Sequence, residues 1–222
     1  MGGVALDLLA EKARPVALAG ERLLPVLDPL APLLPDGGLR RGSVVGVAGS
    51  TSLALALLAG ASAAGSWCAA VGLPSLGVVA AAEVGIVLER FPLVAARAST
   101  DEWAWAVAAL LDAVDVVLVR PPGAVRDAVA RRLAAKVRER SAVLVVTSAW
   151  TGADVRLAAT GAAWEGVGDG HGRLRARRVD VVATGRGAAS RERRAALWLP
   201  GPGGAVEVAT AAAPNARMAD VG

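Results

Sequence analysis

The sequence predicts an α/β protein with a mostly parallel, twisted β-sheet, helices on both faces and an antiparallel C-terminal edge. Between residues 43 and 147, short apolar runs of strand length alternate with helical patterns. The runs contain almost no polar residues, as expected for parallel strands that are covered on both faces. After Trp150 the chain changes to strand-like segments separated by glycine-rich turns, which predicts antiparallel pairing.

The alternating part of the chain gives nine predicted elements. In order they are a strand at 43–47, a helix at 53–64, a strand at 67–72, a helix at 78–84, a strand near 91–94, a helix at 100–111, a strand at 115–119, a helix at 124–140 and a strand at 142–147. Asp101 and Glu102 fall in the first turn of their helix, where the helix dipole favours acidic side chains. Three further strands are expected within 155–165, 172–185 and 193–201, and they extend one edge of the sheet.

The N-terminal part of the chain has a helical pattern that prolines interrupt. Residues 4–34 contain four prolines, so we expect a short helix in ALDLLAEKA and then short turns packed on the domain. The sequence PDGG at 35–38 is a turn and the best boundary. These features divide the chain into an N-terminal helical, proline-rich segment (1–35), a core (36–208) and a tail (209–222) that we expect to be disordered.

The composition excludes several kinds of site. One cysteine and one histidine in 222 residues leave no disulfide framework, no cysteine-rich zinc site and no basis for a histidine metal site or a Ser-His-Asp triad. Residues 1–115 carry a net charge of −4 and residues 116–222 carry +8. The basic residues are nearly all arginine, which suits phosphate or carboxylate partners but also reflects a GC-rich genome.

The long uncharged stretch between Arg41 and Glu83 raises the question of a membrane protein. Glycine, serine and proline recur within it, and a buried strand–helix–strand unit explains it better than two membrane spans. No basic start followed by an apolar run marks a secretory signal. We therefore expect a cytoplasmic protein without membrane attachment.

The segment 39–59 has the order strand, Gly/Ser turn, helix, which is the context of a phosphate-binding P-loop. A P-loop ends in Gly-Lys-Ser/Thr, and counting from Gly46 places Ser52 at the lysine position and Leu53 at the hydroxyl position. The turn could still hold a phosphate weakly through backbone amides, or be only a packed turn. Its residues are Gly46, Gly49, Ser50, Thr51 and Ser52.

The order of these segments resembles the core of the RecA recombinase family over residues 36–205. The strings that carry the resemblance are GVAGSTSLALALLA, WCAAVGLPSLGVVAAAEVGI, VDVVLVRPPGAV and SAVLVVTSAW, followed by the closing strands from VRLAATG to LPGPGG. The resemblance implies that Leu73 stands at the catalytic glutamate position, Arg120 at the magnesium-side aspartate and Ser148 at the sensor glutamine. With Ser52 and Leu53, these departures imply a RecA-like fold that is not an enzyme, with no cofactor and no metal.

Within that superfamily the chain is similar to the ImuA group, in particular its actinobacterial ImuA-prime members. The strings WCAAVGLPSLG and WEGVGDGHGRLRARR and the Arg/Ala-rich composition carry this similarity. It implies an accessory protein of damage-induced (SOS) mutagenesis that binds an ImuB-like polymerase adaptor and, through it, an error-prone polymerase and the sliding clamp. Direct DNA binding and homo-oligomer formation stay open.

Two arginine groups are candidates for contacts with DNA or with an acidic partner. In the strand pattern RLRARR, Arg173, Arg175 and Arg177 share one side, whereas plain exposure is the alternative. Arg131 and Arg138 lie on the helix at 124–140, where the alternative is the solvated side of an amphipathic helix.

The tryptophans divide between core and surface. Trp103 and Trp105 flank Ala104 on one helix, so we expect one to face the core and the other to be available as an interface anchor. Trp164 and Trp198 lie on strands and are expected in the core.

Three functional alternatives to the accessory protein remain at this point. One is a DNA-binding recombination or repair factor that uses the arginine-rich C-terminal half. Another is an active P-loop enzyme that recruits its lysine or arginine from elsewhere in the chain, for example Arg40 or Arg41. The last is an SOS-type cell-division inhibitor, whose family is grouped with ImuA-like proteins.

Overall fold

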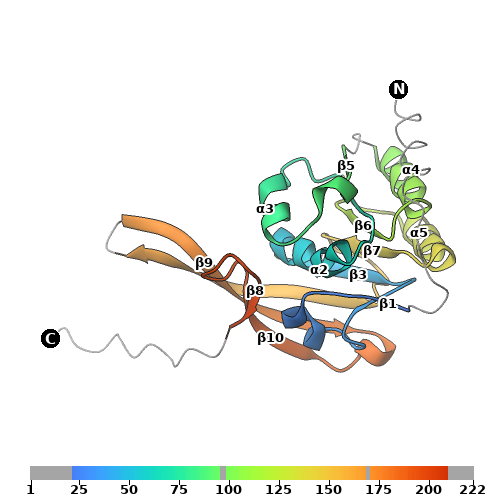
Figure 1. The fold of residues 1–222 in the computed structure, drawn as a ribbon. Helices are drawn as coiled ribbons and strands as arrows, with labels where there is room; N and C mark the ends of the chain where they lie inside the picture. The colour runs from blue at the N-terminus through green and yellow to red at the C-terminus, as the bar shows by residue number, and fades with distance from the viewer. Residues whose placement is uncertain (1–21, 96–98, 169–170, 210–222) are drawn as a thin grey trace.

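The computed structural model describes residues 22–95, 99–168 and 171–209, and its centre is one large β-sheet (Figure 1). The strand order is β11-β10-β9-β8-β3-β7-β6-β4-β5. The strands from β8 to β5 in this order are mutually parallel, and β8 to β11 pair antiparallel. The predicted fold class, a mostly parallel α/β sheet with an antiparallel C-terminal edge, is confirmed.

The elements of the sheet and its flanks follow in chain order. They are β1 (Leu23–Leu24), η1 (Asp28–Leu33), β2 (Leu39–Arg40), β3 (Val44–Ala48), α2 (Thr51–Ala63), β4 (Cys68–Val71), α3 (Val78–Glu83), η2 (Leu88–Arg90), β5 (Leu93–Val94), α4 (Thr100–Leu111), β6 (Val116–Val119), α5 (Asp127–Arg140), β7 (Val143–Val146), β8 (Val155–Gly168), β9 (His171–Gly185), η3 (Gly187–Ala189), β10 (Arg193–Trp198) and β11 (Glu207–Val208).

Each face of the sheet has its own apolar core. Helices α2 and α3 and the short helix η1 pack on one face, with Leu30 and Leu57 fully buried. Helices α4 and α5 cover the parallel strands on the other face, where Trp103 is fully buried and its ring centroid lies 6.4 Å from that of Trp150. The four central parallel strands are therefore buried on both sides, which explains their uninterrupted apolar sequence.

The predicted elements are present, with shifted ends. Helix α4 has the predicted bounds, whereas α2 begins two residues earlier than expected because Ser50 caps it. Helix α5 begins at Asp127 rather than at residue 124. The prolines after residue 24 give the 3₁₀ helix η1, as expected of short turns. The pairs β1–β2 and β10–β11 were not predicted, and the predicted helix in ALDLLAEKA and nearly all of the tail lie outside the described residues.

The segment before β3 packs tightly against helix α2. A Cβ atom on Gly60 would lie 2.5 Å from the backbone carbonyl carbon of Val26, so only glycine allows this approach. Leu30 and Leu33 of η1 belong to the same apolar core as α2. This packing fixes the path of the chain into β3 and so the position of the loop that follows it.

The hairpin of β8 and β9 extends past the rest of the sheet (Figure 1). Strand β8 pairs with β3 only over Val155–Ala158, and β9 pairs with β10 only over Arg178–Ala183. We call the distal part, residues 161–168 and 171–177, the arm. Trp164 lies on it and is 48% exposed, so the expectation that Trp164 is a core residue is wrong. The arm pairs with few residues outside its own two strands. The indole of Trp164 therefore has little apolar surface to pack against.

The prediction for Trp103 and Trp105 is confirmed, whereas the prediction for Trp198 is wrong. Trp103 is fully buried and Trp105 is 60% exposed, which confirms that the pair divides between core and surface. Trp198 is half-buried rather than in the core. Among the described residues, no helix is both long and apolar enough to cross a lipid bilayer.

Asp115 joins the amino ends of four strands. Its carboxylate accepts hydrogen bonds from Arg41 Nη1 at 2.8 Å and from the backbone N–H of Trp67 at 3.1 Å. Its backbone carbonyl accepts from the N–H of Val143. The Arg41 and Asp115 side chains are only 10% and 6% exposed. A buried pair of this kind is expensive to break, because the remaining charge has no partner.

Removing one arginine should show how strongly this buried pair supports the fold. We expect Arg41→Ala to lower the free energy of unfolding by about 3–5 kcal/mol, because it leaves the Asp115 carboxylate buried without its cation. Arg126→Ala is the matched control, since its pair with Asp101 is 3.0 Å long but 73% and 76% exposed, and we expect it to cost less than about 1 kcal/mol. Urea denaturation followed by circular dichroism measures both, and equal losses would contradict the assignment.

Cys68 should be unreactive in the folded protein. Burial of the side chain is the main cause that raises the pKa of its thiol from 9.0 to about 12, and the negative charge of Asp115 adds to this effect. The positive charge of Arg90 acts in the opposite direction and lowers the pKa. Because the thiolate is the reactive form, iodoacetamide labelling of the folded protein should not accelerate between pH 7 and 9, whereas labelling in urea should. Since the folded pKa is the higher one, the thiol stabilises the fold fully below about pH 9 and this contribution is lost as the pH rises toward 12. Equal labelling rates with and without urea would show that the thiol is exposed.

Candidate functional site

The candidate site is the turn between β3 and α2, at the carboxyl end of the parallel strands. Gly49 has φ = +80°, a backbone conformation that favours glycine. A Cβ at this position would also lie 2.6 Å from the carbonyl oxygen of Ala159, so the close packing requires glycine as well. Ser50 is the N-cap of α2, and its Oγ accepts a hydrogen bond from the N–H of Leu53 at 3.1 Å. The strand, turn and helix predicted from the sequence are therefore present.

The positions that would carry P-loop chemistry hold residues that cannot perform it. Leu53, at the hydroxyl position, is fully buried in the core under the sheet, and Ser52 at the lysine position is half-buried. Leu73 follows β4 and packs against the same core. Ser148 follows β7 and lines a hollow together with Gly46. These residues do not fit a nucleoside triphosphate with magnesium, because lysine, hydroxyl and carboxylate are each replaced.

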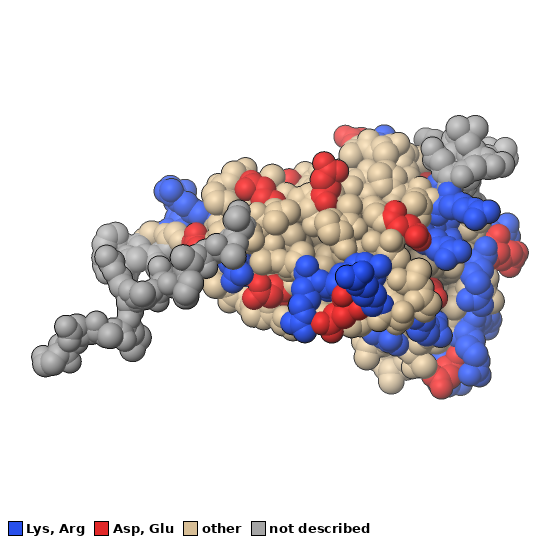
Figure 2. Space-filling view, turned by 90° about the horizontal axis from the view of Figure 1, so that it is seen from below, with Lys and Arg blue, Asp and Glu red and all other residues tan. Residues whose placement is uncertain are grey.

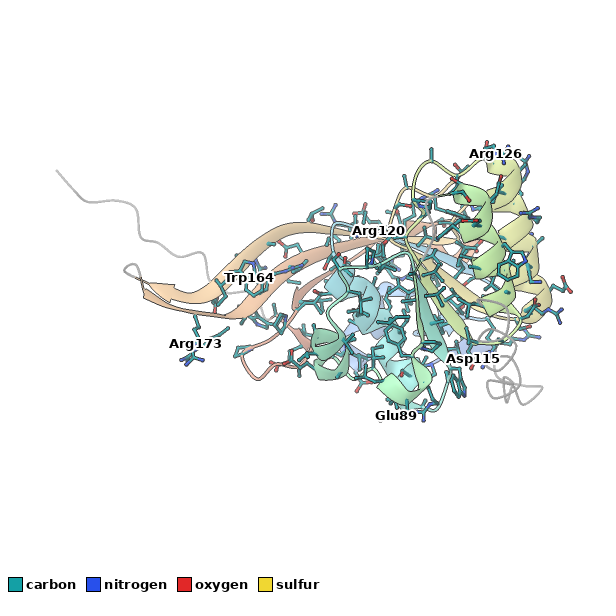
Figure 3. The ribbon with its side chains drawn as sticks, turned by 90° about the horizontal axis from the view of Figure 1, so that it is seen from above. Glu89, Asp115, Arg120, Arg126, Trp164 and Arg173 are labelled. Carbon is teal, nitrogen blue, oxygen red and sulfur yellow. The ribbon has the colours of Figure 1, made fainter. Side chains whose placement is uncertain are left out.

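Arg120 brings a cation to the turn from the end of β6, which β7 separates from β3 in the sheet. It follows β6, and its Nη2 lies 3.5 Å from Thr51 Oγ1 while its Nε lies 3.4 Å from Thr147 Oγ1. The side chain is exposed and points across the carboxyl ends of the strands (Figure 3). A carboxylate at this position would attract a metal cation, whereas a guanidinium repels one.

Arg177 approaches the same turn from the other side. It lies on β9, where its Nη2 donates a hydrogen bond to Ser50 Oγ at 3.0 Å. Its guanidinium carbon lies 5.7 Å from the centroid of the Trp164 ring, a cation–π contact. The sequence placed Arg177 in an arginine-rich strand but gave no signal that it reaches the turn, since β9 is separated from β3 by a whole strand.

The site is therefore positively charged on three sides. Two guanidinium groups meet the N-terminus of α2, which carries the positive end of the helix dipole. Within the described residues neither Arg120 nor Arg177 forms an ion pair. No group of three or more His, Cys, Asp or Glu side chains suited to a metal occurs there either. The arrangement can attract an anion.

Arg40 and Arg41 lie at the opposite end of the strand from the turn. Both precede β3, and Arg41 is engaged with Asp115 at the amino end of the sheet. The five residues of β3 span about 17 Å. Neither Arg40 nor Arg41 is therefore placed to replace the missing lysine.

The three arginines predicted to share a strand face differ in burial and in contacts. Between Glu165 and Val167 the register of the hairpin shifts, so that three residues of β9 stand opposite Gly166 alone. Arg173 and Arg175 lie in this irregular stretch and are exposed, whereas Arg177 is half-buried and directed to the turn. Arg173 points away from the arm in Figure 3.

The arginines of α5 lie away from the candidate site. Arg131 and Arg138 are exposed and form no ion pair in the part of the chain that the structure describes. Lys136 and Arg140 on the same helix both contact Asp112, each at 2.7 Å. Seen from below, basic side chains gather over the body and at its end opposite the arm, with a further group on the arm (Figure 2).

The contact between Arg177 and the cap of α2 can be tested through stability. Ser50→Ala should cost about 1 kcal/mol or more, because α2 loses its cap and Arg177 loses its acceptor. Ser99→Ala is the matched control, since Ser99 Oγ caps α4 by accepting from the N–H of Glu102. In a double-mutant cycle measured by urea denaturation, Ser50→Ala and Arg177→Ala should couple by about 0.5 kcal/mol or more. Additive effects would show that Arg177 does not hold the turn.

Comparison with known proteins gives two matches. A model of the family "MT3502 N-terminal domain" matches residues 32–152, which run from η1 to the loop after β7 and include the turn and Arg120. The protein is also 34% identical over 157 residues to "Uncharacterized protein Rv3395c" of Mycobacterium tuberculosis (strain ATCC 25618 / H37Rv). That alignment covers 69% of this chain and 76% of the relative.

Proposed function

The chain belongs to the family of the MT3502 N-terminal domain, and from this premise we propose that it is a non-catalytic, RecA-like accessory protein of a damage-induced translesion synthesis complex. In this proposal it acts in the cytoplasm by binding an ImuB-like adaptor. Through that adaptor it reaches an error-prone polymerase and the sliding clamp. The partner class comes from the resemblance of the sequence to the ImuA group.

The observation that carries the non-catalytic part is the pair of arginines at the turn after β3. Arg120 stands where the resemblance implies a metal-side carboxylate, and its guanidinium lies 3.5 Å from Thr51 Oγ1. Arg177 is bound to the helix cap. A cation at each side of the turn opposes magnesium binding, so hydrolysis of a nucleotide with magnesium is not expected.

An exposed aromatic side chain supports a role in protein binding. Trp105 is 60% exposed on α4, although its neighbour Trp103 is fully buried. Large exposed aromatic residues are frequent anchors of protein interfaces. Helix α4 is also the element that α5 packs against, so its exposed side belongs to a rigid part of the molecule. We therefore assign the adaptor contact to the α4 surface around Trp105.

Co-purification tests the proposal directly. The protein is tagged at its natural expression level, the cells are exposed to DNA damage, and extracts are treated with nuclease before capture. We expect an inactive-polymerase adaptor and an error-prone polymerase to be recovered after nuclease treatment. Trp105→Ala should reduce the recovered adaptor at least tenfold, the loss typical of a central aromatic anchor. Trp164→Ala, which removes an exposed tryptophan from the arm, is the matched control and should leave recovery unchanged.

Two results would overturn the proposal. Recovery of neither polymerase-type protein from damaged cells would remove the accessory role. Magnesium-dependent ATP turnover by the purified protein, lost on Arg120→Ala, would remove the non-catalytic assignment, because it would show that Arg120 serves chemistry. An unchanged adaptor yield with Trp105→Ala would place the contact elsewhere and contradict the assignment to α4.

A further inference from the structure

The arm is a two-stranded ribbon that projects from the body with little support of its own (Figures 1 and 3). Neither β3 nor β10 pairs with it, and only the base of the arm is tied down, where Arg177 pairs through its backbone with Leu199 and Pro200. Two-stranded ribbons alone are marginal in water. A ribbon that projects in this way is a candidate binding element.

The described residues of the arm carry an excess of positive charge. They include Arg173, Arg175 and Arg177 against a single acid, Glu165. Arg173 and Arg175 are exposed and make no ion pair with any described residue. The shift of register opposite Gly166 places both in an irregular stretch of β9, a feature that commonly redirects side chains. Two free guanidinium groups at a projecting tip fit an anionic partner.

An aromatic ring lies next to these arginines. Trp164 stands directly opposite Arg177 in the ladder, and the guanidinium of Arg177 lies over its ring at 5.7 Å. Arg177 is itself held by Ser50, so the indole rests on a cation that is anchored to the body. The ring is still 48% exposed. A half-exposed indole held by Arg177, on the same arm as the exposed Arg173 and Arg175, is a combination by which proteins bind single-stranded nucleic acid, through stacking and phosphate contacts.

We propose that the arm binds single-stranded DNA, with phosphates on Arg173 and Arg175 and a base stacked on Trp164. This goes beyond the proposed function, which concerns a protein partner on α4, and it is independent of that proposal. A duplex keeps its bases stacked in pairs and offers no free base to the indole, so single strands are favoured. An acidic protein surface is the alternative partner, and failure to bind oligothymidylate in the experiment below would favour it.

Fluorescence anisotropy with a labelled oligothymidylate and the purified full-length chain tests the arm. With two phosphates neutralised, the logarithm of the binding constant should fall with the logarithm of salt concentration at a slope of about −1.4. Trp164→Ala should weaken binding roughly 5- to 100-fold, the loss typical of one stacked base. Arg173→Glu with Arg175→Glu should abolish binding and leave the urea midpoint unchanged, since both side chains are exposed.

A matched charge change separates the arm from general basicity. Arg131→Glu with Arg138→Glu makes the same change of charge on exposed positions of α5 and should leave binding within twofold. The proposal is overturned if the protein does not bind oligothymidylate at low salt, or if the α5 variant loses as much affinity as the arm variant. It is equally overturned if Trp164→Ala binds normally, because the arm would then be an electrostatic surface suited to any polyanion. Adaptor recovery from cells is unaffected by any of these outcomes, so the two proposals fail separately.

Discussion

The buried contact between Arg41 and Asp115 holds together the amino end of the sheet. One carboxylate accepts from Arg41 and from the backbone of Trp67, and the same residue accepts from the N–H of Val143 through its carbonyl. Arg41 Nη1 also lies 3.4 Å from the carbonyl oxygen of Ser141. The chain leading into β3 and the starts of β4, β6 and β7 thus meet at one ion pair. A buried charge pair fixes geometry because no alternative arrangement satisfies both partners.

The carboxyl end of the same strands is organised by backbone geometry and a helix cap at the turn after β3. The turn after β3 depends on Gly49 and on the cap at Ser50, and these backbone requirements are satisfied without any nucleotide. Arg120, at the end of β6, and Arg177, on β9, then supply contacts to the turn from strands that are each one strand removed from β3. A structural turn and a binding turn share the same backbone, so the backbone alone does not indicate function.

The sequence predicts the fold well and the site only in part, for identifiable reasons. The strands β4, β6 and β7 are short apolar runs buried on both faces, and such runs are visible without any knowledge of their neighbours. The departures at Ser52 and Leu53 could be read by counting along the chain, whereas that at Arg120 is implied only by the resemblance to the RecA family. The contact of Arg177 with Ser50 joins residues that are 127 positions apart, and only the order of the strands brings them together. The prediction that Trp164 is a core residue assumed that its whole strand lies within the sheet. The β8–β9 hairpin in fact extends beyond the sheet, and Trp164 lies on the part that extends.

The distribution of arginine follows from the same division of the molecule. Several arginines of the body have acidic partners: Arg41 has Asp115, Arg140 has Asp112 and Arg186 has Asp154. On the arm the nearest acid in the ladder, Glu165, stands opposite Ala176 rather than opposite an arginine. A basic composition inherited from the genome would place unpaired arginines anywhere on the surface, but it would not fix a half-exposed indole against one of them. The contact of Arg177 with both Trp164 and Ser50 does so, and it connects the arm mechanically to the turn after β3. A ligand bound to the arm would therefore first affect the hydrogen bond between Arg177 and Ser50 at the cap of α2.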